Sequence, residues 1–181
     1  MAMVRPAGGG SRAHNARGFT LVEVLTVITV VAALLGLAWL NFASMQKRYT
    51  EEQQVKKLHA DLLETRVRAM QHGRSHFVSV ASNTFYSTYE DTDPQPDGNG
   101  LLSTATDSLL KTVNLIATYT WVKSIPTATL VTFTDKGLLS SGTPTLWIRI
   151  NPSSGAEFDC VVISEIKTGM GSINGTNCIT K

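Results

Sequence analysis

One carboxylate stands near the start of a long apolar run. Residues 17–25 read Arg-Gly-Phe-Thr-Leu-Val-Glu-Val-Leu, and the apolar run extends from Phe19 to Phe42 with Glu23 as its only charge. A charge at the centre of a bilayer costs roughly 2.5–3.5 kcal/mol, so such a residue is functional by default and requires a partner. The alternative is an acid tolerated at a membrane interface. We favour the functional interpretation and take Glu23 as the first candidate site residue.

The two cysteines, Cys160 and Cys178, both follow the apolar run. If this part of the chain lies in an oxidising compartment, a disulfide between them is expected. It would close a loop of about 18 residues, worth ~3 kcal/mol on a chain-entropy estimate. Two reduced thiols are the alternative, and either interpretation is structural rather than catalytic.

An acidic stretch offers oxygen ligands at short spacing. Residues 90–99 contain carboxylates and an amide that could hold calcium, with Asp91, Asp93 and Asp97 as the candidates beside Glu90 and Asn99. The spacing differs from an EF-hand loop and two prolines interrupt it. An acidic, solvated turn is therefore favoured over a calcium site.

The histidines do not predict a zinc site. His72 and His76 straddle an expected helix end, His59 lies further back, and no cysteine or third clustered ligand joins them. The chain also lacks the sequence patterns of a nucleophile elbow, a zinc protease helix or a phosphate loop. We therefore expect no catalytic residue, no metal and no cofactor, and a protein that is not an enzyme.

The charge is distributed unevenly. Arg5, Arg12 and Arg17 lie in residues 1–18, which contain no acid, so 13 of the 16 Lys and Arg residues remain against 14 acids. The rest of the chain has a net charge of −1. This balance is not that of a nucleic-acid-binding protein, so DNA is not expected as a partner.

The apolar run has the length of a membrane span. A helix over its 24 residues extends ~36 Å, enough for a ~30 Å hydrocarbon core. The arginines before it predict a cytoplasmic N-terminus and an exported remainder. An ordinary secretory signal has a shorter apolar core and a small-residue cleavage site after it. The only small-residue break here is Gly18, and cleavage there would remove the leader 1–18 and keep the helix.

The helix is expected to continue beyond the span. Residues 41–72 contain no Gly or Pro, and Gly73 is a plausible C-cap, so residues 19–72 predict one helix. The first half, 19–42, is apolar all round. The second half, 43–72, is amphipathic, with one face formed by Val55, Leu58, Leu62, Thr65 and Ala69.

Residues 73–181 have the composition of a β-rich domain. Six segments rich in β-branched and aromatic residues are separated by turn clusters; they are 75–82, 84–90, 112–122, 128–134, 145–151 and 158–166. A helical turn is possible at 104–112. The fold class predicted is α+β, with about six antiparallel strands packed on the amphipathic half of the helix.

The N-terminal segment carries a family resemblance. Gly18-Phe19-Thr20-Leu21-Val22-Glu23, after a basic leader and before an apolar helix, resembles the N-terminus of type IV pilins and type II secretion pseudopilins. The resemblance implies that a prepilin peptidase cleaves after Gly18 and methylates the new amine of Phe19. It also implies that mature subunits leave the membrane and pack as a helical filament. The partner of Glu23 would then be the Phe19 amine of a neighbouring subunit.

Two further segments narrow the resemblance. Residues 58–82 are similar to the helix end and first strand of GspH/FimT-like minor pseudopilins, and residues 131–151 resemble a later strand–turn–strand of that family. Many major pilins have a proline near the position of Leu40, so Leu40 suits a minor component. Some FimT-like proteins bind DNA through a basic C-terminal motif, but the tail 169–181 has only Lys181.

The function expected is therefore that of a structural subunit, a minor pseudopilin or minor pilin of a type II secretion pseudopilus or a type IV pilus. The resemblance implies as partners other pilin or pseudopilin subunits, the prepilin peptidase, an inner-membrane assembly platform and, before assembly, the membrane itself. It implies a bacterial inner-membrane protein with a periplasmic C-terminal domain, later part of the fibre. The alternatives are a FimT-like DNA-uptake minor pilin and a signal-anchored periplasmic binding protein.

Overall fold

The computed structural model describes residues 18–140 and 145–181, except for the side chains of Leu37, Ala38, Leu40 and Asn41. The expectations for leader residues 1–17 and for Leu40 fall outside the described residues. The chain forms two compact units that meet between Phe42 and Ala43.

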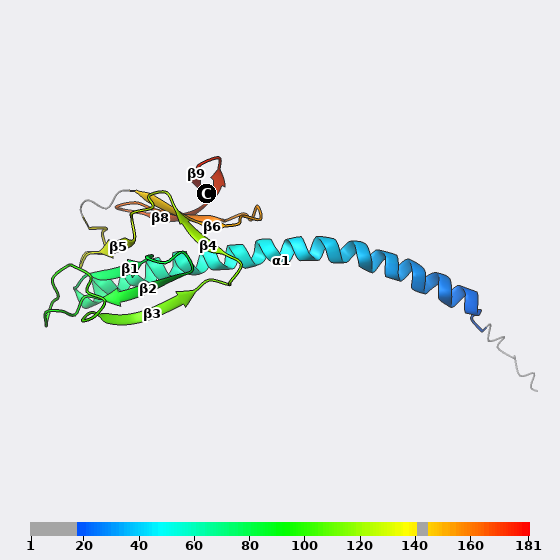
Figure 1. The fold of residues 1–181 in the computed structure, drawn as a ribbon, viewed down its shortest axis with the longest axis horizontal. Coiled ribbons are helices and arrows are strands. Elements are labelled where there is room, and N and C mark those ends of the chain that lie inside the picture. Colours follow the sequence, from blue (N-terminus) through cyan, green and yellow to red (C-terminus); the bar gives the residue numbers. More distant parts are fainter. Residues whose placement is uncertain (1–17, 141–144) are drawn as a thin grey trace, which may run out of the picture. The chain divides into compact units, whose positions relative to one another are not determined.

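One long helix, α1, extends over Leu21–His72 (Figure 1). It begins after Thr20, whose side-chain Oγ1 accepts the N–H of Glu23 at 3.3 Å. A Thr followed by Glu three residues later is the sequence of a capping box, which satisfies amides that a helix start leaves unpaired. It ends before Gly73, which has a φ of 65° and donates its N–H to the Ala69 carbonyl at 3.0 Å. Glycine adopts this left-handed conformation without a Cβ penalty, so the expected C-cap is present.

The second half of α1 buries one face. The five positions expected to share that face are all buried, with at most 3% of any residue exposed: Val55, Leu58, Leu62, Thr65 and Ala69. The opposite face carries two ion pairs at i, i+4 spacing, Glu52 with Lys56 at 3.0 Å and Glu64 with Arg68 at 2.8 Å. The helical periodicity of the sequence therefore predicted the buried face correctly.

Two antiparallel sheets complete the 43–181 unit (Figure 1). The first has the order β3-β2-β1-β5; its strands are β1 (His76–Ser79), β2 (Phe85–Glu90), β3 (Ser108–Asn114) and β5 (Leu130–Phe133). The second has the order β4-β6-β7-β8-β9; its strands are β4 (Thr120–Lys123), β6 (Leu146–Asn151), β7 (Cys160–Ile163), β8 (Thr168–Asn174) and β9 (Asn177–Thr180). The predicted α+β class with antiparallel sheets is confirmed.

The strand assignments differ from the sequence expectation in three places, two of which concern β3 and β4. Residues 112–122, expected as one strand, contain the end of β3 and the start of β4, which belong to different sheets. The helical turn expected at 104–112 is wrong from Ser108 onward, because β3 begins there and pairs with β2, Leu109 opposite Tyr89. Tertiary pairing with a neighbouring strand overrides the weak local helical preference of this segment.

The β8–β9 hairpin was not expected. Its two-residue turn is Gly175-Thr176, and Gly175 has a φ of 63°, while Asn174 pairs with Asn177. A glycine with positive φ at the first turn position is typical of a type II′ hairpin. The strands themselves are rich in Gly, Ser, Asn and Thr, so their composition resembles that of a loop.

One core joins the helix to both sheets. Val55, Leu58 and Leu62 of α1 are buried together with large side chains from the two sheets. The first sheet contributes Val78, Tyr86, Val131 and Phe133, and the second contributes Trp121, Leu146, Ile148, Ile150, Val161 and Ile163. Each sheet therefore buries its apolar face on a surface that α1 provides.

The predicted disulfide between Cys160 and Cys178 is present. It connects β7 to β9 although β8 lies between them, and its Cα atoms are 6.1 Å apart. Two strand spacings in a flat sheet amount to ~9.5 Å, so the sheet curls at β8. Gly171 permits this curl, because a Cβ there would lie 2.1 Å from the carbonyl oxygen of Ile179.

Residues 43–181 expressed alone should give a soluble, folded domain, because the remaining helix has one apolar face and the sheets cover it. The measurement is monodispersity on gel filtration without detergent, with a cooperative thermal transition. Recovery only in membranes or inclusion bodies under oxidising conditions would contradict the division of the helix into two parts.

Leu62→Ala in this domain should lower the free energy of unfolding by about 2–5 kcal/mol, because Leu62 is fully buried in the core. Leu63→Ala is the matched control, since its side chain is 39% exposed on the same helix and the change should cost below about 1 kcal/mol. Urea unfolding followed by circular dichroism gives both values. Equal losses for the two variants would contradict the buried face.

Cys178→Ser should lower the stability of the oxidised domain by about 3 kcal/mol, because the disulfide restricts an 18-residue separation in the unfolded chain. Reductant should lower the thermal midpoint of the unsubstituted domain in the same way and leave that of the variant unchanged. A midpoint that is insensitive to reductant in both proteins would rule out a stabilising disulfide.

Candidate functional site

The two residues of the expected cleavage site, Gly18 and Phe19, are solvent-exposed. Gly18 and Phe19 precede α1, and Phe19 is 82% exposed. A Cβ on Gly18 would find no neighbouring atom within 4 Å, and its φ lies outside the left-handed region. Among the described residues, neither a close neighbour nor the backbone conformation requires glycine at this position.

Glu23 lies in the first turn of α1. A carboxylate there interacts favourably with the unpaired amides and positive dipole of a helix N-terminus. The Thr26 hydroxyl donates to the Glu23 carbonyl and the Thr29 hydroxyl to the Thr26 carbonyl, both at 2.8 Å. Within the described part of the chain no ion pair involves the Glu23 side chain. The polar groups of this segment are thus satisfied within the helix, apart from the carboxylate.

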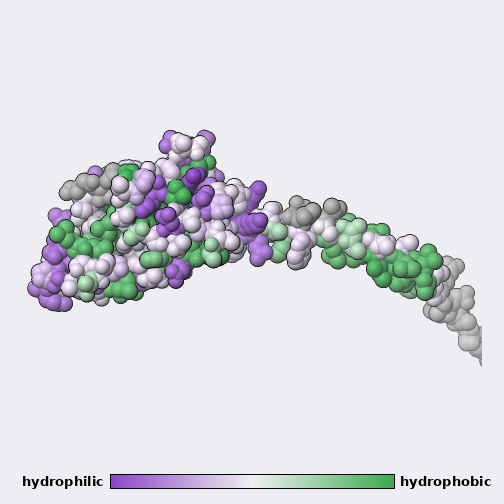
Figure 2. All heavy atoms as spheres, in the orientation of Figure 1, coloured by the Kyte–Doolittle hydropathy of each residue, from purple (hydrophilic) through white to green (hydrophobic). Residues whose placement is uncertain are grey.

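The first part of α1 exposes apolar side chains around its whole circumference. Every residue from Phe19 to Gly36 is exposed, and Figure 2 shows apolar residues gathered along this part of α1. An exposed apolar surface of this extent is typical of an interaction site for protein or lipid. Among the helices of the described residues, none satisfies the length and hydropathy that a bilayer crossing demands.

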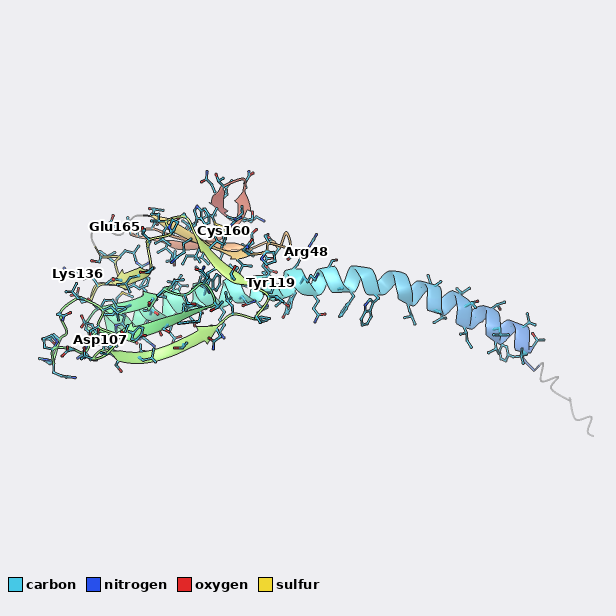
Figure 3. The ribbon with its side chains drawn as sticks, in the orientation of Figure 1. Arg48, Asp107, Tyr119, Lys136, Cys160 and Glu165 are labelled. Carbon is cyan, nitrogen blue, oxygen red and sulfur yellow. A yellow bond between two sulfur atoms is a disulfide. The ribbon has the colours of Figure 1, made fainter. Side chains whose placement is uncertain are left out.

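Buried carboxylates on the second half of α1 connect it to the sheets. Glu51 is fully buried, and its Oε2 accepts the N–H of Ser154 at 2.7 Å and also the Ser154 hydroxyl. Nearby, the Tyr119 hydroxyl donates to the Lys47 carbonyl at 3.3 Å and Arg48 Nε donates to the Ser154 carbonyl at 3.2 Å (Figure 3). Burial, assisted by the negative charge of Glu51, raises the pKa of Tyr119. Sequence analysis missed Glu51 because its burial depends on distant segments.

Asp61 makes a second connection of this kind. Its carboxylate accepts the Tyr86 hydroxyl of β2 at 2.5 Å and pairs with the Lys111 ammonium of β3 at 2.6 Å. Burial and the hydrogen bond to Asp61 raise the pKa of Tyr86 well above its usual value, so this hydroxyl remains a donor. The arrangement holds the helix on the first sheet and offers no nucleophile with a general base.

The acidic loop is organised by its own backbone. Asp91 is buried, and its carboxylate accepts the N–H of Asn99 at 3.2 Å and of Gly100 at 2.6 Å. Asp91, Asp93 and Asp97 are not brought together as a cluster of metal ligands in the described structure. The oxygens of Asp91 already have partners, so the geometry favours the acidic turn over the calcium site.

A different cluster forms where α1 ends. His72, His76 and Glu90 place one ligand atom each within 4.8 Å of one another, and no other such trio of His, Cys, Asp or Glu occurs in the described residues. Burial lowers the pKa of His76, outweighing the effect of the Arg74 carbonyl and of Glu90, which raise it. Sequence analysis ended an expected strand at Glu90 and also named it beside the acidic candidates, but it missed the third member because spacing does not reveal the register that places Glu90 opposite His76.

Comparison with known proteins supports both the N-terminal motif and the fold. Residues 13–39 match the prokaryotic N-terminal methylation motif, a segment that contains Gly18, Phe19 and Glu23. The type IV minor pilin FimU of Pseudomonas aeruginosa has a similar structure, with a TM-score of 0.51 and 16% sequence identity over 71% of this chain and 92% of FimU. No curated protein sequence matches the chain significantly. The predicted resemblance to type IV pilins and pseudopilins is confirmed, and the chain has the pilin fold.

Proposed function

We propose that this chain is a non-enzymatic structural subunit, a minor pilin or GspH/FimT-like minor pseudopilin, that assembles into a filament of a type IV pilus or type II secretion machine through its N-terminal helix. The observation that carries the proposal is the methylation motif at the head of a helix whose apolar side chains are exposed on all sides. Such a surface requires lipid or protein around it.

The first step of the proposed pathway is processing. A prepilin peptidase cleaves after Gly18 and methylates the amine of Phe19, while the arginines of the leader keep the N-terminus in the cytoplasm. The exposed position of both residues, ahead of the first helical turn, leaves the scissile bond accessible. The absence of any folding requirement for glycine at position 18 supports recognition by the peptidase as its role.

The second step is transfer from membrane to fibre. Residues 19–42 anchor the precursor in the inner membrane, and the domain 43–181 lies in the periplasm. In the fibre the apolar helices pack against one another, with the assembly platform and other pilin or pseudopilin subunits as partners. The backbone-bonded hydroxyls of Thr26 and Thr29 suit both environments, because they present no unpaired donor to lipid or to a neighbouring helix.

Glu23 selects the correct packing. Four residues separate it from Phe19, about 6 Å along a helix axis, so a neighbour displaced by that amount brings its terminal amine level with the carboxylate. Each charge alone is costly in an apolar core, and pairing offsets that cost. The Glu23 carboxylate also lies in the first helical turn, at the position where a capping box has Glu or Gln, so pairing and capping need separate tests.

The substitution Glu23→Gln separates charge pairing from helix capping. Glutamine retains the capping-box chemistry, since Gln and Glu both serve at this position, but it removes the charge. We expect Glu23→Gln and Glu23→Leu to be cleaved after Gly18 and inserted as well as wild type, yet both to be depleted several-fold from sheared fibres. Glu64→Gln, which neutralises an exposed acid on the same helix, is the control and should assemble normally.

The readouts are the mass of the mature N-terminus and the partition between sheared fibres and membranes. A methylated Phe19 supports the proposal, and an intact residue 1 favours a signal-anchored binding protein instead. Normal assembly of Glu23→Gln with failure of Glu23→Leu would assign Glu23 to capping alone. Failure of cleavage in either variant would assign it to the peptidase step.

A further inference from the structure

The end of α1 brings two imidazoles and a carboxylate together. His72 is the last residue of α1, His76 is the first residue of β1, and Glu90 is the last residue of β2. The strand register pairs His76 directly with Glu90, and the two histidine rings meet edge to face with centroids 5.5 Å apart. We propose that His72, His76 and Glu90 form a binding site for a divalent transition metal of the Zn²⁺ type.

The hydrogen bonding of His76 points to a ligand. Its Nδ1 lies 3.2 Å from the Arg74 carbonyl, which can only accept, so Nδ1 carries the proton and Nε2 presents a lone pair. That Nε2 is fully buried and has no hydrogen-bond partner. A buried acceptor without a partner is costly. A histidine whose Nδ1–H is held by a backbone carbonyl is the usual arrangement of a metal-binding imidazole, and a metal ion would satisfy Nε2.

Glu90 supplies the anionic ligand. Its Oε1 lies 2.8 Å from His72 Nδ1 and 3.6 Å from Arg74 Nε, and its side chain is 14% exposed. A metal would replace the His72–Glu90 hydrogen bond with two coordinate bonds. Arg74 could stay beside the carboxylate, as outer partners of ligating carboxylates do, and its own Nε is a buried donor without a hydrogen bond. Its positive charge lowers the affinity that Glu90 alone would give.

The ligand set favours zinc over calcium or magnesium. Imidazole nitrogens suit zinc and its neighbours in the transition series, whereas calcium and magnesium take oxygen ligands. Two His and one Glu leave a fourth tetrahedral position open. His72 is exposed while His76 is buried, so the open position faces solvent on the His72 side and would hold water or a donor from another molecule.

A metal bound by His72, His76 and Glu90 would link α1, β1 and β2. The ion would connect the last turn of α1 to both strands of the β1–β2 hairpin, across the short connection 73–75. Because the ligands come together only in the folded domain, binding stabilises the folded state. All three ligands belong to the 43–181 domain and none to the N-terminal motif, so the test of metal binding is independent of filament assembly.

The test is zinc binding by the untagged mature chain in detergent. Titration calorimetry with ZnCl₂ should show one site per chain, and Co²⁺ should give the visible absorption of a four-coordinate ion with nitrogen ligands. His72→Gln and Glu90→Gln should each weaken Zn²⁺ binding by at least about 10-fold, the loss that even an outer-shell partner causes. His59→Gln, which removes a histidine of the same helix outside the cluster, should bind like wild type.

Thermal unfolding provides a second measurement. Zn²⁺ should raise the midpoint of wild type and of His59→Gln, and a chelator should reverse the increase, whereas His72→Gln and Glu90→Gln should show a smaller shift at the same Zn²⁺ concentration. His72 and Glu90 are the variants of choice because His76 is fully buried and its substitution disturbs the fold. No zinc-dependent heat or midpoint shift in wild type, or equal affinities in wild type and the two cluster variants, would overturn the proposal.

Discussion

The burial of one face of α1 is the interaction on which the 43–181 domain depends. The two sheets have separate strand orders, and both contribute large apolar side chains to the one core that contains Val55, Leu58 and Leu62. An antiparallel sheet with one apolar face must cover it with another element, and here a single helix serves both sheets. If the apolar face of α1 pointed in another direction, the apolar face of each sheet would be partly exposed to solvent. The periodicity of this one segment therefore sets the arrangement of everything that follows it in the chain.

Buried polar contacts fix the position of the helix along the sheets. Apolar contacts alone tolerate sliding, since one leucine can replace another at little cost. Glu51 bonds the segment after β6, and Asp61 bonds β2 and β3, so each sheet has one charged anchor on α1. A displaced register would leave a buried carboxylate without its donors, which costs far more than a lost apolar contact. These contacts explain how a long helix with few distinctive features keeps one alignment.

Sequence reasoning succeeded where a pattern is local. The buried stripe of α1, the cap at Gly73 and most strands follow from periodicity and turn residues that lie close together in the chain. It failed where distant segments decide the outcome. Residues 169–180 resemble a loop in composition and become strands only because β7 offers an edge to pair with. Glu90 belongs to an acidic run in sequence but to a histidine pair in space, since strand register rather than spacing brings it to His76. At the N-terminal motif the residues were identified from sequence, whereas the Thr20 cap on Glu23 emerged only with the helix start.

The disulfide that attaches β9 to β7 has a consequence for the end of the chain. β9 is an edge strand that pairs with β8 alone and exposes most of its side chains, so few contacts oppose its fraying. Its one covalent attachment is the bond from Cys178 to the buried Cys160. Reduction would remove this bond and leave β9 held by its hydrogen bonds to β8. The thiol–disulfide balance of the surrounding compartment therefore sets how firmly the final residues are held to the domain.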